Sequence, residues 1–150
     1  MIVVSNASSL IALERIHRQE LLKSLFGTIF IPPAVRVEVF GEGQIPEWIA
    51  ERAPKLHFRP SKDLGKGETE AIALALELRA DWLLMDDLDG RKEAIRVGLS
   101  VMGTIGVLIM ARQQGVINDL RLVLDELTSS GFYFDEKLRM LALSIVGELP

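Results

Sequence analysis

The sequence predicts an α/β protein with three layers (α/β/α), in which helices cover both faces of a parallel central sheet and extra helices follow at the C-terminal end. Short aliphatic runs, such as residues 2–4 and 82–85, alternate with segments whose apolar residues recur at helical spacing. Alternating strands and helices form parallel sheets with right-handed crossovers. After Gly115 only helical spacing is found, and this predicts the extra helices.

The composition fits a single domain over residues 1–150, because 49% of the residues are hydrophobic and 25% are charged. The absence of cysteine excludes disulfides and cysteine-based zinc sites, and two histidines leave oxygen as the main metal ligand. Without a signal peptide or a membrane-length apolar run, we expect a cytoplasmic protein with no membrane partner. The net charge of −4 argues against a protein that coats nucleic acid electrostatically.

The first strand is expected at residues 2–4, where three β-branched side chains occur in a row. Ser8 or Ser9 is placed to cap the helix that follows over residues 10–16. The next three elements are a helix ended by a glycine, a strand, and a helix that starts at a proline, expected over residues 19–26, 28–31 and 33–39.

Two polar residues in these elements suggest a site. Asn6 follows the first strand, and in a parallel sheet it could meet Asp87 at the end of another strand. A local turn to its own backbone is the alternative. Glu38 projects onto the apolar face of its helix. Its alternative is a surface partner for Arg36, but residues two apart on a helix do not face each other.

Residues 44–52 are expected to form a short helix and residues 55–59 an edge strand, followed by a polar loop. The helix over residues 68–78 begins with an acid. At about 100° per residue, Glu68 shares the apolar face of this helix, whereas Glu70 and Glu77 fall on the opposite face and are expected to face solvent. Glu68 therefore points toward the edge of the core from a first turn, where the helix dipole stabilises an acid.

Three aspartates follow the apolar strand over residues 82–85, at positions 86, 87 and 89. In open α/β sheets, ligand sites form beyond the carboxyl ends of the strands. Carboxylates grouped there repel one another unless a cation joins them, and a divalent metal is the common solution. The alternative is a capping turn, because aspartate is a favoured N-cap residue.

The rest of the chain is expected to form a helix, the last strand and three more helices, over residues 91–97, 99–102, 103–114, 118–130 and 135–146. Asn118 and Asp135 are plausible caps of the last two helices, and Gly147 is a natural stop. The final helix carries an apolar stripe of Leu138, Leu141, Ala142 and Ile145. Such a helix covers its own sheet or pairs with another subunit, and we expect a homodimer.

Two families of doubly wound proteins with carboxylates at strand ends lack support in the sequence. Response-regulator receivers need an acidic pair after strand one and a lysine after the last strand, where this chain has Ser5-Asn6 and Gly103-Thr104. Haloacid-dehalogenase phosphatases need a DxD motif after strand one. No Walker loop or GxGxxG motif is present either.

The motifs resemble those of the PIN domain, and in particular those of small prokaryotic PIN-like proteins. These proteins open with S-[DN]-x-S-x-L-I, carry G-E-x-E-A-I-A-L-A in the middle, and continue with L-L-x-D-D, a following G-R, and G-T-x-G-V-L. The matching motifs stand here in the same order, at residues 5–11, 67–75, 83–87, 90–91 and 103–108. The resemblance covers nearly the whole chain and implies a PIN-like central sheet.

The resemblance implies a metal-dependent ribonuclease that hydrolyses RNA phosphodiester bonds, often as the toxin of a toxin-antitoxin pair with a small antitoxin protein as partner. By position, the catalytic acids fall on Glu38, Glu68 and Asp87, with Asp86 as the other choice for the last of them. The implied ligands of Mg²⁺ or Mn²⁺ are Asn6, Glu38, Glu68, Asp87 and Asp89. The implied supporting residues are Asn6, Ser8, Asp86, Asp89 and Thr104.

Basic residues near these acids could bind the phosphates that flank the scissile bond, as charge-assisted hydrogen-bond donors. The candidates are Arg36, Arg91 and Lys92. Their alternative is plain solvated charge, which is the usual state of exposed arginine and lysine. For Thr104, the alternative to lining the site is capping its own helix.

The sequence departs from the family pattern at Asn6, where an acid is usual. An amide oxygen can ligate magnesium, but it carries no charge and cannot act as a base. The departure should weaken metal affinity and lower or abolish activity. Two alternatives therefore stand beside the ribonuclease: an inactive PIN-like module that binds RNA or a protein, and a structural oligomer in which the acids only cap helices.

Overall fold

Five parallel strands form the central sheet, in the order β3-β2-β1-β4-β5. The computed structural model describes residues 1–149. The strands are β1 (Val3–Ser5), β2 (Ile29–Ile31), β3 (Ile49–Glu51), β4 (Trp82–Leu84) and β5 (Val101–Met102). In the register of the sheet, Val4 of β1 lies opposite Phe30 of β2 and Leu83 of β4. The first strand of the chain is therefore the central strand of the sheet.

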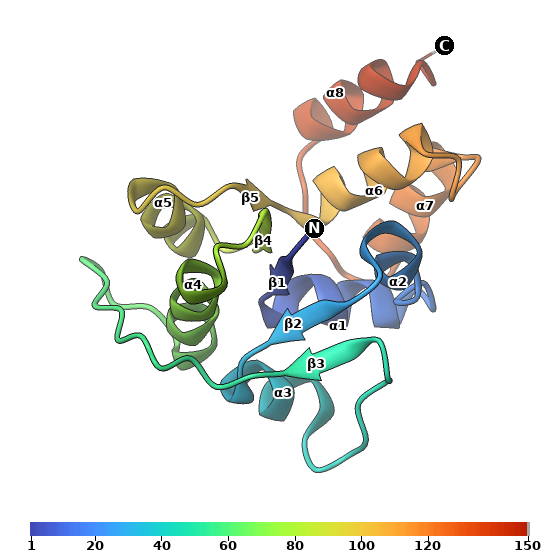
Figure 1. Cartoon of the computed structure of the whole chain (residues 1–150). Helices are drawn as coiled ribbons and strands as arrows, with labels where there is room; N and C mark the ends of the chain where they lie inside the picture. The colour runs from blue at the N-terminus through green and yellow to red at the C-terminus, as the bar shows by residue number, and fades with distance from the viewer. Residues whose placement is uncertain (150) are drawn as a thin grey trace.

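Helices cover both faces of this sheet, which confirms the three-layer prediction (Figure 1). Their bounds are α1 (Ala7–Arg15), α2 (Leu21–Phe26), α3 (Pro33–Phe40), α4 (Lys66–Leu78), α5 (Leu88–Arg96), α6 (Thr104–Gln113), α7 (Leu120–Ser129) and α8 (Glu136–Val146). Successive side chains of β1 point to opposite faces. Val3 packs with α1, α2 and α6, whereas Val4 packs with α4 and α5. The predicted extra helices, α7 and α8, pack mainly against α6 and against each other.

Two predictions in the middle of the chain are wrong. Residues 44–52 contain the edge strand β3 and no helix, because Trp48 and Ile49 are buried and the backbone pairs with β2. Residues 55–59 form no strand, although their pattern alternates. The amides of Lys55 and Leu56 donate to Glu77 Oε1, over 2.7 and 3.0 Å, instead of to a neighbouring strand.

Two glutamates predicted to face solvent are instead half-buried and hold other segments. Glu77 anchors the loop after β3, as described above. Glu70 Oε1 accepts a hydrogen bond from the Ala34 amide in the first turn of α3, over 3.1 Å. The prediction failed because a helical projection gives the direction of a side chain but not the segment that packs over it.

Several helix ends differ from the prediction by one turn or less. Helix α1 begins at Ala7, so neither Ser8 nor Ser9 caps it, and the side chain of Asn6 at the N-cap position makes no capping hydrogen bond. Asp119, and not Asn118, caps α7. The predictions for α8 are confirmed: the Asp135 side chain accepts from the Leu138 amide, and Gly147 ends the helix with φ 77°.

Among residues 1–149, no helix is both long and apolar enough to cross a membrane.

Glu93 of α5 forms hydrogen bonds with the loop that precedes α4. Its carboxylate accepts hydrogen bonds from the amide and hydroxyl of Ser61 and from Arg96 Nε. The hydrogen bond from the Ser61 hydroxyl, followed by that from Arg96, lowers the pKa of Glu93 from 4.5 to about 2. A carboxyl group whose pKa is lowered on folding stabilises the folded state above its unfolded pKa, and this contribution is lost as the pH falls toward the folded value.

We therefore expect the Glu93→Gln variant to lose less stability than the wild type between pH 4.5 and about 2. Urea unfolding followed by circular dichroism, at a series of pH values, measures the difference. Glu42→Gln in the exposed turn after α3 is the matched control, because it removes a carboxylate with no hydrogen bond among the described residues. Equal acid sensitivity of the wild type and Glu93→Gln would contradict the assignment.

Candidate active site

A pocket of ≈ 270 Å³ lies at the carboxyl ends of β1 and β4. Its lining residues come from α1, α3, α4, the start of α5 and the end of α7: Asn6, Ser8, Ile11, Ala12, Arg15, Glu38, Glu68, Asp87, Ser130 and Phe132. Four of the five metal ligands implied by the sequence are among them. Segments separated by more than half of the chain thus supply oxygen atoms to one cavity.

Asn6 and Glu38 approach each other over Gly67 in the first turn of α4. A Cβ added to Gly67 would lie 3.2 Å from Glu38 Oε1 and 3.4 Å from Asn6 Oδ1. A side chain at this position would crowd Glu38 Oε1 and touch Asn6 Oδ1, so a glycine leaves room for both side chains beside the start of α4. Asn6 is only 5% exposed, and no hydrogen bond among residues 1–149 involves its side chain. Its amide is therefore not used by a local turn.

Ser8 adds a hydroxyl to the same pocket from the first turn of α1. Its Oγ is buried and has no hydrogen-bond partner among the described residues. Buried hydroxyls are nearly always hydrogen-bonded in native proteins, to protein, water or a ligand. An unpartnered hydroxyl beside Asn6 therefore points to a polar group that occupies the pocket.

Glu68 enters the pocket from α4, and its side chain folds back over Gly65 at the start of that helix. The Glu68 carboxylate leaves no room there, since an added Cβ on Gly65 would lie 2.5 Å from Glu68 Oε2. No ion pair among residues 1–149 involves Glu68. The amino end of its own helix interacts favourably with its charge.

Asp86 and Asp87 are adjacent in sequence but have separate surroundings. Asp87 lines the pocket, and its Oδ2 also accepts a hydrogen bond from the Gly90 amide, over 2.8 Å, as the N-cap of α5. Asp86 lies outside this pocket. Its two oxygens accept hydrogen bonds from the amide and hydroxyl of Thr104, each over 2.7 Å. Of the two aspartates, only Asp87 has an oxygen left for a ligand in this pocket.

Thr104 does not line the pocket but joins three elements behind it. It is fully buried, and its hydroxyl also lies 2.9 Å from the hydroxyl of Ser9 in α1. Gly103, and not Thr104, is the N-cap of α6. The expectation that Thr104 caps its own helix is therefore wrong, and Asp86 binds this helix start from the end of β4.

Besides Asp86 and Thr104, four more of the predicted site residues lie outside the pocket: Asp89, which the resemblance implied, and the basic candidates Arg36, Arg91 and Lys92. Asp89 lies on the surface of α5, 3.4 Å from Lys62 Nζ, because α5 begins one turn earlier than predicted. Arg36 pairs with Glu51 and donates to backbone carbonyls of the turn after α3. The other two are on α5: Arg91 donates to the Met85 carbonyl, and Lys92 is exposed.

Besides the apolar Ile11 and Ala12 of α1, sequence reasoning missed three lining residues: Arg15, Ser130 and Phe132. Arg15 is exposed and has no ion pair among residues 1–149. A usable signal existed for it, because Ser8 and Arg15 are seven residues apart and so share one face of a helix. The other two come from the end of α7 and reach the pocket only through tertiary packing.

The lining residues suit a hard divalent cation in their chemistry. Carboxylate, amide and hydroxyl oxygens are the ligands that Mg²⁺ and Mn²⁺ prefer. Among residues 1–149, however, no three Asp, Glu or His side chains converge as the ligands of one ion. Glu68 folds over Gly65 and Asp87 caps α5, so their oxygens ring the pocket instead of meeting at a point.

Comparison with known proteins gives a match over nearly the whole chain. A family model described as DUF3368, a PIN domain, matches residues 2–148. Among solved structures, the chain is similar to a PilT N-terminus domain protein from the hyperthermophilic archaeon Sulfolobus solfataricus, with 20% sequence identity and a TM-score of 0.49. That likeness covers 91% of this chain and 98% of the other. No curated protein matches the chain.

Proposed function

Because the chain belongs to the PIN domain family, we propose that it is a metal-dependent ribonuclease that hydrolyses RNA phosphodiester bonds. PIN domains are generally nucleases and typically use divalent metals. The observation that carries the proposal for this chain is the pocket that Asn6, Glu38, Glu68 and Asp87 line together. These residues come from four different segments, and helix capping alone does not explain why they share one cavity.

Each lining residue has a role that follows from its chemistry. Glu38, Glu68 and Asp87, with the amide oxygen of Asn6, would hold Mg²⁺ or Mn²⁺. When bound, such an ion supplies an activated water and a counter-charge for the leaving oxygen. Arg15 at the rim donates hydrogen bonds to phosphate oxygens and so holds the RNA backbone over the pocket.

A second candidate is a PIN-like module that binds RNA or a protein with little or no cleavage. Asn6 favours it, because the amide brings no charge to the metal and cannot accept a proton as a base. The dispersed positions of the Glu68 and Asp87 oxygens also favour weak metal binding. The two candidates differ in their response to added metal.

Purified protein incubated with single-stranded and structured RNA, in Mn²⁺, in Mg²⁺ and in EDTA, tests the proposal. We expect cleavage only with metal, and a loss of at least about 100-fold in Asp87→Asn. Asparagine is as good an N-cap as aspartate, so this variant removes the charge and keeps the start of α5. Absence of both metal-dependent cleavage and calorimetric metal binding would refute the ribonuclease and leave the binding module.

We also propose that the protein acts as the toxin of a toxin-antitoxin pair. Expression that arrests growth, and rescue by the product of a small neighbouring gene, would support this role. Growth arrest by Asp87→Asn as strong as by the wild type would contradict it.

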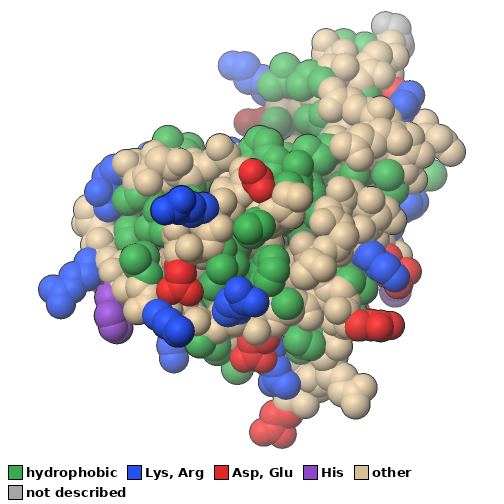
Figure 2. All heavy atoms as spheres, in the orientation of Figure 1, with side chains coloured by type: hydrophobic (Ala, Val, Ile, Leu, Met, Phe, Trp, Pro, Cys, Tyr) green, Lys and Arg blue, Asp and Glu red, His purple; other side chains and the backbone are tan. Residues whose placement is uncertain are grey.

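The proposed homodimer has its own support in α8. Figure 2 shows hydrophobic side chains over this helix, and Leu138, Leu141 and Ile145 are 37, 56 and 50% exposed. These side chains belong to the apolar stripe predicted from the sequence, of which only Ala142 is buried. Sedimentation equilibrium of the wild type and Leu141→Lys measures the association.

A further inference from the structure

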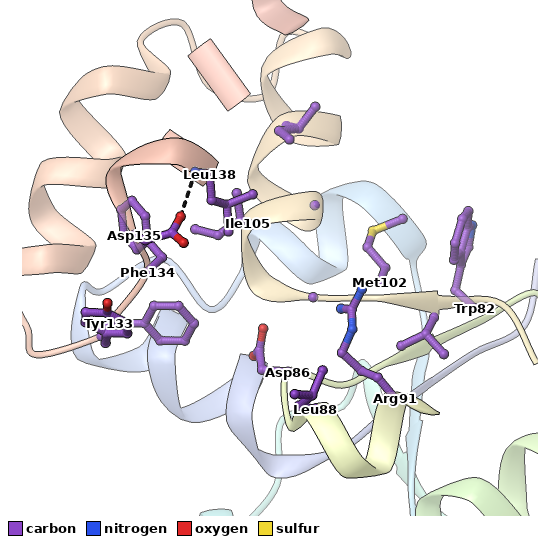
Figure 3. Close-up of a pocket in the computed structure, with 15 residues that line it drawn as sticks. Trp82, Asp86, Leu88, Arg91, Met102, Ile105, Tyr133, Phe134, Asp135 and Leu138 are labelled. Atoms are coloured by element: carbon purple, nitrogen blue, oxygen red, sulfur yellow. Dashed lines mark hydrogen bonds between the residues drawn. The ribbon is translucent and has the colours of Figure 1, made fainter. Parts of the chain in front are cut away.

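A second and larger pocket, of ≈ 620 Å³, lies beside the candidate active site (Figure 3). We call it the aromatic pocket and define it by Trp82, Arg91, Phe132, Tyr133, Phe134 and Asp135. Figure 3 shows Tyr133, Phe134 and Asp135 on one side, Arg91 on the other, and Asp86 between them. Most of its lining is apolar, with a few polar groups at defined places, as in sites that bind small organic groups.

The aromatic pocket adjoins the candidate active site. Phe132 lines both cavities. Asp86 lines the aromatic pocket, and the next residue, Asp87, lines the candidate active site. A nucleotide chain with a phosphate at the active site would therefore have a neighbouring base within reach of the aromatic pocket.

The segment after α7 holds one aromatic ring out of the core. Phe132 and Phe134 pack against the main hydrophobic cluster, with ring centroids 6.4 Å apart. Tyr133 between them is 86% exposed. A ring this exposed adds little to the stability of the fold, whereas exposed aromatic rings on a fixed segment are what unpaired bases stack on.

The charges in the aromatic pocket favour a base over a phosphate. Its lining holds two carboxylates, Asp86 and Asp135, against one guanidinium, that of Arg91. One N–H of the Arg91 guanidinium donates a hydrogen bond to the Met85 carbonyl, and Asp135 Oδ1 accepts one from the Leu138 amide. The other guanidinium donors and the second Asp135 oxygen can therefore meet the edge of a base, which carries both acceptors and donors.

We infer that the aromatic pocket binds an unpaired nucleobase of the RNA, next to the phosphodiester that the candidate active site takes. This inference takes its ligand, RNA, from the proposed function. It does not require that the protein cleaves the RNA.

Binding of a short fluorescent single-stranded RNA, measured by anisotropy in Mn²⁺ and in EDTA, tests the inference. The Asp87→Asn background keeps the RNA intact. Tyr133→Ala should weaken binding by about fivefold or more, as expected for loss of one base stack, and Tyr133→Phe should bind like its parent. Leu122→Ala, on an exposed site of α7 outside the pocket, is the matched control.

An abasic nucleotide moved along the RNA shows whether Tyr133 acts on a base. At the position whose base would occupy the aromatic pocket, the abasic nucleotide should weaken RNA binding to the Asp87→Asn parent. It should not weaken RNA binding further when Tyr133→Ala is also present. Unchanged affinity in Tyr133→Ala would overturn the inference and leave the ribonuclease standing. Affinity that depends on Tyr133 without any cleavage by the wild type would support the pocket and refute the ribonuclease.

Two further outcomes would overturn the inference. If Tyr133→Ala changes only the self-association of the protein in sedimentation, the aromatic pocket is a contact between copies. If the protein binds no RNA at all, both the base site and the proposed function fail.

Discussion

Replacing Glu68 with glutamine should lower metal-dependent RNA cleavage by at least about 100-fold, as expected for loss of a charged metal ligand. Glutamine keeps the size of the side chain and removes its charge. Glu68 makes no ion pair among residues 1–149, so removal of its charge costs the fold only its interaction with the helix start. Cleavage rates with Mn²⁺, together with thermal unfolding, separate an effect on the site from an effect on the fold.

Glu70→Gln is the matched control, because Glu70 lies two residues further along the same helix. Its Oε1 accepts from the Ala34 amide, and a glutamine oxygen can do the same. We expect cleavage in Glu70→Gln to remain near the wild-type rate. If both variants lose activity equally, the charge of α4 as a whole matters, and a specific role for Glu68 is refuted.

Replacing Asn6 with aspartate should strengthen Mn²⁺ binding and raise the cleavage rate, each on the order of tenfold, because ligand charge tunes metal affinity. The added carboxylate would lie beside Glu38 over Gly67. Without metal the new charge at the nearly buried position 6 is repelled by the exposed Glu38 carboxylate, so the variant should unfold at a lower temperature than the wild type. Added Mn²⁺ should reverse this difference, since a ligand that binds the folded state stabilises it.

The change in unfolding temperature that Mn²⁺ causes is therefore as informative as the cleavage rate. Asn118→Asp adds the same charge at an exposed position before α7 and serves as the control. It should change neither the shift nor the cleavage. An Asn6→Asp variant with the metal response and activity of the wild type would show that Asn6 does not contact the metal.

The sequence predicts the elements whose signals are local. Strand β1 is a β-branched run, and the start of α8 has an aspartate cap that the structure confirms. Strand β3 has no such local signal. It forms because its backbone pairs with β2 and because Trp48 is buried. Residues 55–59 alternate like a strand but have no strand beside them. In both segments, whether a strand forms depends on a pairing partner that is distant in sequence.

The same distinction applies to the candidate site. Asn6 and Asp87 follow strands that are neighbours in the sheet, and helical projection places Glu38 and Glu68 on apolar faces, so local rules could bring all four toward one place. Asp89 was placed from its position after the strand and from the family pattern, and a helix start one turn earlier than predicted turns it to the surface. Phe132 has no local signal, because its place depends on how α7 and α8 pack against α6.

The central position of β1 has a consequence for synthesis on the ribosome. Strand β2 follows β1 after two helices, whereas β4, which pairs with the other edge of β1, begins only at Trp82. A growing chain therefore carries an unpaired edge on β1, without the cover that α5 and α6 later give to Val4 and Val3, until more than half of the domain has been made. Unpaired apolar edges are sites of aggregation. We expect ribosome-bound chains that end before β4 to bind chaperones and to resist proteolysis poorly, and chains that extend past β5 to lose both properties.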